Sequence, residues 1–305
     1  MTAATNKYGH ELVFGAMVEA VAERPLEVLA VAAAMEEAGL DVIALPDHPY
    51  WTHRLDTFAV MAAVLSRTSR ITVMANLANL PLRPPPVLAR TAATLDLLSG
   101  GRFELGVGTG AQQLWSSILA EGGPRRDAKQ SVDALVEAVE IIRALWTSEV
   151  PVDKEGAYYR VAGAAPGPAP AHEIPIWFGA YQPRMLRLTG ALADAWIPSS
   201  PGMPPERLPE ANRIIDDAAL AAGRRPEDIR RGLNVEGEFS TDVAYSPGEP
   251  LLKGLPSRAW AEQLADLALN HGISSFFLYR VESADLLRRF AAEVVPAVRE
   301  MVAAH

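Results

Sequence analysis

The stretch Gly101–Ala111, which reads GRFELGVGTGA, runs from a short apolar segment into three alternating glycines. Taken alone, it satisfies the dinucleotide fingerprint G-x-G-x-x-G/A, in which glycines let the backbone approach a pyrophosphate. In a Rossmann domain this turn follows the first strand, and a second strand carries an acidic residue about 20 positions later. The fold therefore depends on which strand of the chain this turn follows.

The hydrophobic pattern places the turn after the fourth of eight predicted strand–helix pairs. The apolar segments expected as strands are Glu11–Val18, Asp41–Leu45, Ile71–Leu77, Arg102–Gly108, Ile174–Ala180, Ala195–Pro198, Ile229–Phe239 and Ser275–Arg280. The helical patterns that follow them are Pro25–Ala38, Asp56–Ser66, Pro84–Leu98, Asp127–Trp146, Pro183–Gly190, Pro204–Ala222, Ser257–Asn270 and Ser283–Val302. Apolar strands that alternate with helices predict a parallel sheet covered on both faces.

Eight such units in 305 residues predict an α/β fold of the (β/α)8 TIM barrel type, with a doubly wound open sheet as the alternative. The dinucleotide interpretation fails on context, because no strand ending in Asp or Glu follows the turn before Ile174. The Pro/Gly-rich passage from Thr147 to Glu173 is expected to be an insertion after the fourth βα unit, with a small hairpin around Tyr158–Val161. We expect one domain, residues 1–305, with the insertion at about 147–173.

Composition limits the classes of function. The formal net charge of −9 disfavours nucleic acid as a partner, because binding phosphates needs a basic surface. No apolar run approaches the roughly 18 residues of a membrane span, and the N-terminus lacks a secretory-signal pattern, so we expect a cytoplasmic protein with no membrane contact. Cysteine is absent, which excludes disulfides and thiolate sites, and the six histidines show no metal-ligand spacing. No metal site is predicted.

Three segments in combination resemble the bacterial luciferase-like monooxygenase superfamily. They are VIALPDH at Val42–His48, LDLLSGGRFELGVGTGA at Leu95–Ala111 and IPIWFGAYQPRMLRLTGALADAWIPSS at Ile174–Ser200. The resemblance extends over nearly the whole chain. It implies a (β/α)8 barrel that binds a tricyclic ring at its C-terminal mouth, with the insertion covering the active site. Members of the superfamily use either FMN or the deazaflavin coenzyme F420.

The resemblance also implies a non-prolyl cis peptide at the end of the third strand, bulging against the central ring. The best match is Ala75–Asn76, and Asn76 is expected to hydrogen-bond the ring edge. One departure concerns the deazaflavin enzymes, which often place a catalytic glutamate directly after the glycine turn. This chain has Ala111 and Gln112 there, which weakens the expectation of such an acid and of sugar-phosphate dehydrogenase activity.

Asp47 and His48 end the second strand, on the rim where barrel enzymes keep their chemistry. A histidine there can exchange a proton near neutral pH or hydrogen-bond a ring carbonyl, and the alternative is a loop or capping residue. Asp47 either contacts the ring or caps a turn. We assign both to the candidate catalytic site.

Two further segments are candidates for binding the cofactor. Gly106, Gly108, Thr109 and Gly110 form a tight turn whose backbone, free to adopt positive φ, can closely approach the ring or its polyol. The run Gly179, Ala180, Tyr181 and Gln182 precedes Pro183 at a helix start, where free N–H groups and the helix dipole suit a phosphate.

Aromatic and basic residues near the rim are candidates for the substrate pocket. Trp51 and Trp115 lie on loops beside His48 and the glycine turn, and Arg280 ends the eighth strand, where the alternative is a salt bridge. Trp177 lies in mid-strand and is expected in the core.

The resemblance implies an oxidoreductase that transfers hydride between F420 and a small organic substrate, with His48 handling a proton. The alternative is an FMN-dependent monooxygenase that uses reduced flavin and O2, and a second alternative is a non-catalytic flavin-binding barrel. A partner reductase that supplies reduced flavin or F420, and a homodimeric state, are also expected from the resemblance.

Overall fold

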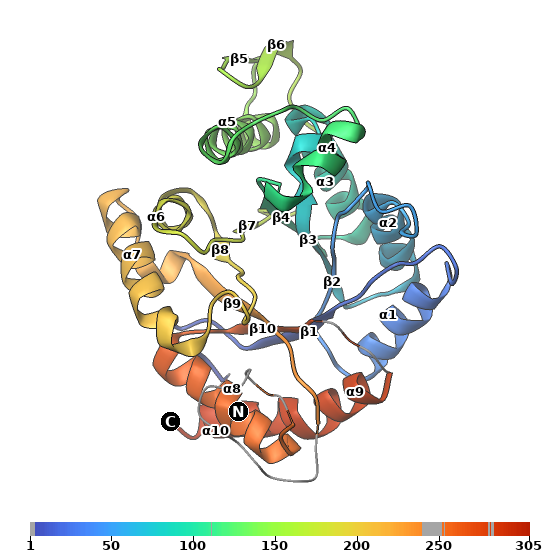
Figure 1. The fold of residues 1–305 in the computed structure, drawn as a ribbon, viewed down its shortest axis with the longest axis vertical. Helices are drawn as coiled ribbons and strands as arrows, with labels where there is room; N and C mark the ends of the chain where they lie inside the picture. The colour runs from blue at the N-terminus through green and yellow to red at the C-terminus, as the bar shows by residue number, and fades with distance from the viewer. Residues whose placement is uncertain (1–3, 111, 240–251, 253, 280, 282–283) are drawn as a thin grey trace. The chain divides into compact units, whose positions relative to one another are not determined.

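The computed structural model describes residues 4–110, 112–239, 252, 254–279, 281 and 284–305 (Figure 1). Eight strands form a closed barrel in the order β1-β10-β9-β8-β7-β4-β3-β2, and the pairs β1–β10, β1–β2, β10–β9, β3–β4, β7–β8 and β8–β9 are parallel. Their bounds are β1 Val13–Met17, β2 Val42–Leu45, β3 Thr72–Asn79, β4 Phe103–Gly108, β7 Ile176–Phe178, β8 Ala195–Trp196, β9 Arg230–Val235 and β10 Ser275–Leu278. The predicted (β/α)8 barrel is confirmed, and the open doubly wound sheet is excluded.

The helices follow the strands in the predicted alternation. They are α1 Glu27–Glu37, α2 Thr57–Arg67, α3 Pro85–Ser99, α4 Trp115–Ala120, α5 Ala128–Thr147, α6 Pro183–Leu192, α7 Leu208–Ala221, α8 Ser257–His271, α9 Ala284–Arg289 and α10 Val295–Ala303. The chain groups into two compact units. The first comprises Met1–Val18, Ala30–Ala44 and Trp177–His305, and the second comprises Glu19–Leu29 and Leu45–Ile176. A single domain over residues 1–305 stays a prediction.

Local signals in the sequence fix several helix ends. Asp56 caps α2 by accepting a hydrogen bond from the Ala59 N–H at 2.9 Å. Asp127 and Gln130 form a reciprocal capping box at the start of α5. Such caps contribute about 1 kcal/mol each, because they satisfy N–H groups that have no partner inside the helix.

The structure differs from the expected elements in two places. The short helix α4 follows the glycine turn, where no helix was predicted. The helix expected over Ser283–Val302 is divided into α9, a π-helical turn at Phe290–Val294, and α10. Pro296 explains this division, because its nitrogen cannot donate to the carbonyl four residues earlier.

The predicted insertion forms a hairpin that is longer than expected. Strands β5 (Val152–Glu155) and β6 (Arg160–Ala164) pair antiparallel (Figure 1). The Glu137 carboxylate on α5 accepts hydrogen bonds from the backbone N–H groups of Ala157, Tyr158 and Tyr159, at 2.8 to 3.1 Å. One carboxylate therefore holds the tip of the hairpin against α5.

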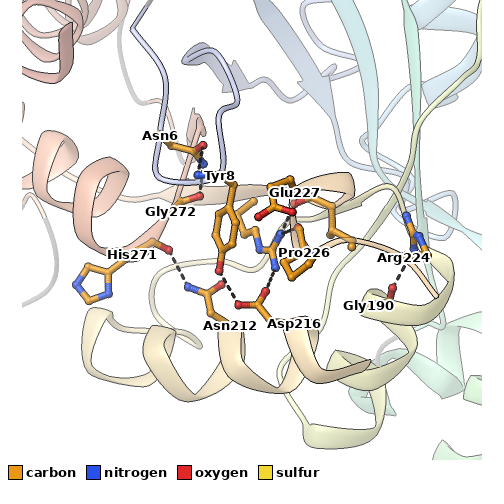
Figure 2. Close-up of polar contacts among 12 residues, drawn as sticks. Asn6, Tyr8, Gly190, Asn212, Asp216, Arg224, Pro226, Glu227, His271 and Gly272 are labelled. Carbon is orange, nitrogen blue, oxygen red and sulfur yellow. Dashed lines mark hydrogen bonds and ion pairs between the residues drawn. The ribbon is translucent and has the colours of Figure 1, made fainter. Parts of the chain in front are cut away.

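In the first unit, a polar network anchors the N-terminal segment to α7 and to the loop that follows it. Figure 2 shows Tyr8 beside Asp216, whose carboxylate accepts a hydrogen bond from the Tyr8 hydroxyl at 2.9 Å. Asp216 also pairs with Arg231, which is fully buried and whose guanidinium lies 4.1 Å from the centroid of the Tyr8 ring. The segment before β1 therefore compensates a buried charge at the start of β9.

Candidate functional site

The side chain of Asp47, at the end of β2, is fully engaged. Its carboxylate accepts hydrogen bonds from Arg83 Nε at 2.6 Å, from Arg83 Nη2 at 2.7 Å and from the Asn79 backbone N–H at 2.9 Å. Burial opposes the charge of Arg83, but hydrogen bonds and charges from Asp47 and Asp56 outweigh it and raise the pKa of Arg83. Asp47 therefore ties the end of β2 to the segment after β3, and its oxygens are already committed to protein donors.

His48 is half-buried and has one engaged ring nitrogen. Its Nδ1 lies 2.7 Å from the Tyr50 hydroxyl, and its ring packs against Trp51 with centroids 4.2 Å apart and the ring planes tilted by 31°. Among the described residues, no group hydrogen-bonds Nε2, and this atom is not among the enclosed unpartnered ones. Nε2 is thus the nitrogen that a ligand can reach.

Burial and the nearby Arg54 favour the neutral imidazole of His48. Burial lowers the pKa of His48 most, and the Arg54 guanidinium lowers it further, while Asp47 and Glu19 oppose the shift. Arg54 lies 4.2 Å over the Trp51 ring and forms an ion pair with Glu19. Trp51 therefore contacts both His48 and Arg54, the cation that lowers the pKa of His48.

The Tyr50 hydroxyl stays protonated over the ordinary pH range. Burial raises the pKa of Tyr50 to about 12, the Asp47 charge adds to the rise, and a hydrogen bond from the Asn79 side chain opposes it. The Asn79 side-chain oxygen is itself buried without a hydrogen-bond partner in the described part of the chain. The Tyr50 phenol thus lies beside His48, and the Asn79 amide lies beside the Tyr50 phenol.

The end of β3 contains the expected non-prolyl cis peptide, but at Asn76–Leu77, one residue later than the predicted Ala75–Asn76. The pairing of β3 with β4 shifts register between Ala75 and Ala78 at the same place. Ala75 and Asn76 are both buried. The bulge that the resemblance implied is therefore present, and its role in binding a ring stays a prediction.

The three glycines of the turn after β4 differ in the space around them and in backbone conformation. A Cβ on Gly106 would lie 2.3 Å from the Ala75 carbonyl oxygen, so this glycine permits the close approach of β3 and β4. A Cβ on Gly108 would meet Leu77 at an ordinary 3.4 Å. Of the three, Gly110 has a positive φ, of 79°. The expectation of positive φ is thus wrong for Gly106 and Gly108, whose backbone stays in the strand.

In the first unit, the run from Gly179 to Gln182 leads from β7 into α6. The Ala180 carbonyl accepts a hydrogen bond from Trp196 Nε1, and the Tyr181 hydroxyl accepts one from the Ser199 N–H, each at 2.9 Å. Gln182 precedes Pro183 at the helix start and makes no side-chain cap. Tyr181 and Ala180 therefore have structural contacts, and the phosphate role of this run stays a prediction.

The remaining candidates are placed as follows. Trp115 is half-buried at the start of α4, after the glycine turn. Trp177 is buried, as expected. Arg280 and Ala111 lie outside the described residues. Within the described ranges, no three metal-ligating side chains gather, and no helix is long and apolar enough to cross a bilayer.

Sequence reasoning missed the residues that organise the His48 site. Arg83 is 36 positions from Asp47, and Asn79 is 32 positions away, so neither contact has a local signal. Arg54 was not among the predicted residues. The Pro46-Asp47-His48 sequence at a strand end was the signal for His48, and the functional role of this rim stays a prediction.

Comparison with known protein families shows the family of the chain. The family model described as luciferase-like monooxygenase matches residues 9–236 of the chain. The chain belongs to this family. Among its luciferase-like relatives is a protein of Nocardia farcinica, named F420-dependent glucose-6-phosphate dehydrogenase. That protein is 34% identical over 273 residues, which cover 87% of this chain and 77% of the relative. A protein of the same name from Mycolicibacterium gilvum is 32% identical and covers 76% of this chain and 70% of its own length.

Solved luciferase-like structures share the fold. An F420-dependent secondary alcohol dehydrogenase in complex with an F420-acetone adduct superposes with a TM-score of 0.83 at 21% identity, covering 95% of this chain and all of that one. Monooxygenase RslO1 from Streptomyces bottropensis superposes with a TM-score of 0.75 at 21% identity, covering 93% and 99% of the two chains. At these identities the likeness establishes the barrel fold alone.

Proposed function

We propose that this protein is an oxidoreductase that transfers hydride between coenzyme F420 and a small organic substrate, with His48 as its proton carrier. Sequence relatives at 34% and 33% identity are named F420-dependent dehydrogenases. The observation that carries the proposal is the state of His48, which is held at one nitrogen and open at the other. A proton carrier needs this combination of fixed orientation and access to the substrate.

The residues of the second unit fit a planar, hydrogen-bonding ring. When bound, the deazaflavin supplies the position that donates or accepts hydride. The β3 bulge at Ala75 to Ala78 offers a backbone ledge, and the Asn79 side-chain oxygen is a buried acceptor with no partner among the described residues, which suits a ring N–H. Gly108, Thr109 and Gly110 would lie along the polyol. In the first unit, phosphate binding by Gly179 to Gln182 is a separate proposal.

The substrate we propose is not a sugar phosphate. The relatives of that activity carry the name glucose-6-phosphate dehydrogenase. This chain has Ala111 and Gln112 where the resemblance places a catalytic glutamate, so a second acid is missing from the proposed site. Trp51 and Trp115 would give the substrate pocket an aromatic wall, which favours a compact, weakly polar molecule.

A pair of titrations tests the cofactor. Purified protein is titrated separately with F420 and with FMN, and binding is followed by the fluorescence of each cofactor. We expect saturable binding of F420 at lower concentration than FMN. Tighter binding of FMN, with oxygen-dependent turnover, would replace the proposal by a flavin monooxygenase. Binding of F420 without turnover of any alcohol, aldehyde or ketone would identify a non-catalytic carrier.

The cellular setting is part of the same proposal. A protein that uses F420 needs another enzyme to reduce or reoxidise the cofactor, so a reductase or a second dehydrogenase would be its metabolic partner. We also propose a cytoplasmic location and a homodimer, both on the strength of the family resemblance. Sedimentation of the purified protein tests the dimer directly.

A further inference from the structure

The contact between His48 and Tyr50 determines more than the orientation of the imidazole. Nδ1 and the phenolic oxygen are 2.7 Å apart, a normal length for one hydrogen bond with a single proton between them. Either Tyr50 donates to Nδ1, or Nδ1 donates to Tyr50. The two cases place the ring proton of a neutral His48 on opposite nitrogens.

The chemistry of the two groups favours donation by Tyr50. A phenol O–H is a good donor and a phenol oxygen is a weak acceptor, whereas an unprotonated imidazole nitrogen is a strong acceptor. The Asn79 side chain already offers a hydrogen bond to the Tyr50 oxygen, which leaves the hydroxyl proton to be donated elsewhere. Nδ1 is therefore the acceptor, and the proton of the neutral ring is on Nε2.

The groups around His48 keep the ring neutral, so that it has only this one proton. Burial lowers the pKa of His48 most. Arg54, whose guanidinium lies over the Trp51 ring, lowers it further. Asp47 opposes both, but its oxygens are taken by Arg83 and the Asn79 N–H, and Glu19 is paired with Arg54. Tyr50 faces the ring as an uncharged phenol, because its pKa is about 12.

We propose, building on the F420-dependent function above, that Tyr50 fixes His48 as an Nε2–H donor and that the site accordingly selects substrates with a carbonyl or imine at the reacting carbon. Such a group accepts the Nε2–H hydrogen bond directly. An alcohol whose proton must be removed needs the opposite tautomer, in which Nδ1–H would have to donate to the Tyr50 oxygen, the less favourable of the two arrangements. The preferred substrate class is therefore a ketone, aldehyde or imine that is taken up with the reduced cofactor.

The step balances through the same two residues. The carbonyl carbon would gain a hydride, and with it two electrons, which the reduced cofactor would supply when bound, and the C=O π pair would become a lone pair on oxygen. That oxygen takes the proton from Nε2. Nδ1 takes the proton of the Tyr50 hydroxyl, so His48 is neutral and the negative charge rests on the phenolate. Because a phenolate is a much weaker base than an alkoxide, the transfer is downhill. Water then gives a proton to Nε2 while the Nδ1 proton returns to half-buried Tyr50, which restores the starting tautomer.

Nitrogen NMR of histidine-labelled protein, without cofactor, tests the tautomer. The signal of His48 is assigned as the one lost in His48→Gln. We expect a protonated Nε2 and an unprotonated, hydrogen-bonded Nδ1 at neutral pH. In Tyr50→Phe the two tautomers should become mixed. The control Tyr159→Phe removes a hydroxyl that is bound by Arg126 in the hairpin, and should leave the His48 signal unchanged. A proton on Nδ1 in the unmodified protein would overturn the proposal.

Kinetics with matched ketone–alcohol pairs test the substrate class. We expect KM to be lower for the ketone with reduced F420 than for its alcohol with oxidised F420. Tyr50→Phe should raise the KM of the ketone by about tenfold, leave that of the alcohol nearly unchanged and lower kcat. An equal rise in both KM values, or a lower KM for alcohols, would refute the assignment. Failure of the protein to bind F420 at all would refute the proposed function and leave the NMR result standing.

Discussion

Two neighbouring residues at the end of β2 have opposite environments, and this difference separates their roles. Asp47 is buried and accepts three hydrogen bonds, two of them from Arg83. A carboxylate so occupied can position the loop, but it has little capacity left for a substrate. His48 keeps Nε2 open. At the scale of single residues, the proposed proton chemistry therefore rests on His48, with Asp47 positioning it.

The His48→Ala substitution should lower turnover by about 100-fold or more, the usual contribution of a general acid or base. Cofactor affinity should change much less, because the contacts proposed for the ring and its tail come from other residues. The measurements are kcat with reduced F420 and the Kd from fluorescence titration. His48→Gln should recover part of the loss if hydrogen bonding is the main role, since glutamine donates but does not titrate. Full activity of His48→Ala would require another proton carrier.

Arg54 provides a separate test of the charge around His48. Its guanidinium lowers the pKa of His48, so Arg54→Gln should raise that pKa and leave Glu19 as an unpaired anion nearby. Since removing the proton of an alcohol needs neutral His48, alcohol oxidation with oxidised F420 is lost as the pH falls through the pKa of His48. The acid limb of the pH–rate profile should therefore move to higher pH in this variant.

The matched control for that experiment is Arg24→Gln. Arg24 is an exposed arginine of the same unit, and it is paired with Glu27 on the surface. Its profile should coincide with that of the unmodified protein. If the acid limb of the pH–rate profile shifts equally in both variants, the effect comes from the net charge of the protein and not from the contact of Arg54 with Trp51.

At the scale of elements, the turn after β4 has a packing role at Gly106, and the cofactor-binding role that we propose for it would fall on Gly108. Gly106 faces the bulged part of β3, where its missing side chain makes room for the Ala75 carbonyl. Gly108 has ordinary space around it. The structure therefore assigns the packing role to Gly106, and the binding role of Gly108 stays a prediction.

Alanine at each of these positions should separate stability from binding. Gly106→Ala places a methyl group against backbone and should lower the free energy of unfolding by about 1–3 kcal/mol, the usual cost of overpacking. Gly108→Ala should leave stability within about 0.5 kcal/mol and weaken F420 binding if the backbone there approaches the cofactor. Urea unfolding and fluorescence titration measure the two effects. Unchanged affinity in Gly108→Ala would make the turn purely structural.

At the scale of the whole molecule, the sequence was sufficient for the barrel because its evidence is periodic and local. Apolar strands such as Val42–Leu45 and capped helices such as α2 are written in consecutive residues. The site was only partly predictable, because its decisive contacts join distant segments. Asp47 pairs with Arg83, which follows both α2 and β3 in the chain. Nothing near Arg83 in the sequence signals that pairing. Helix α4 was missed because six residues carry too little periodicity.

The N-terminal segment of the first unit makes stability depend on pH. The His10 ring nitrogen Nε2 lies 2.8 Å from the Glu227 carbonyl, to which a neutral ring donates. Burial lowers the pKa of His10 to about 4, and the charge of Arg230 adds to the shift, while the hydrogen bond to Glu227 opposes it. In the unfolded chain the pKa is near the ordinary 6.5. Between these two values the unfolded state binds a proton that the folded state excludes, so stability falls as the pH drops from about 6.5 to about 4.

His10→Gln should remove this part of the acid sensitivity. Glutamine can still donate to the Glu227 carbonyl but takes up no proton, so the variant should lose less stability than the unmodified protein between pH 7 and pH 4.5. Because His10 is partly exposed, the full shift is discounted, and we expect a relative gain of about 1 kcal/mol at the lower pH. Urea unfolding at both pH values measures it. Every other titrating group is shared by the two proteins. Equal losses of stability in both would therefore show that His10 is not the group that titrates over this pH range.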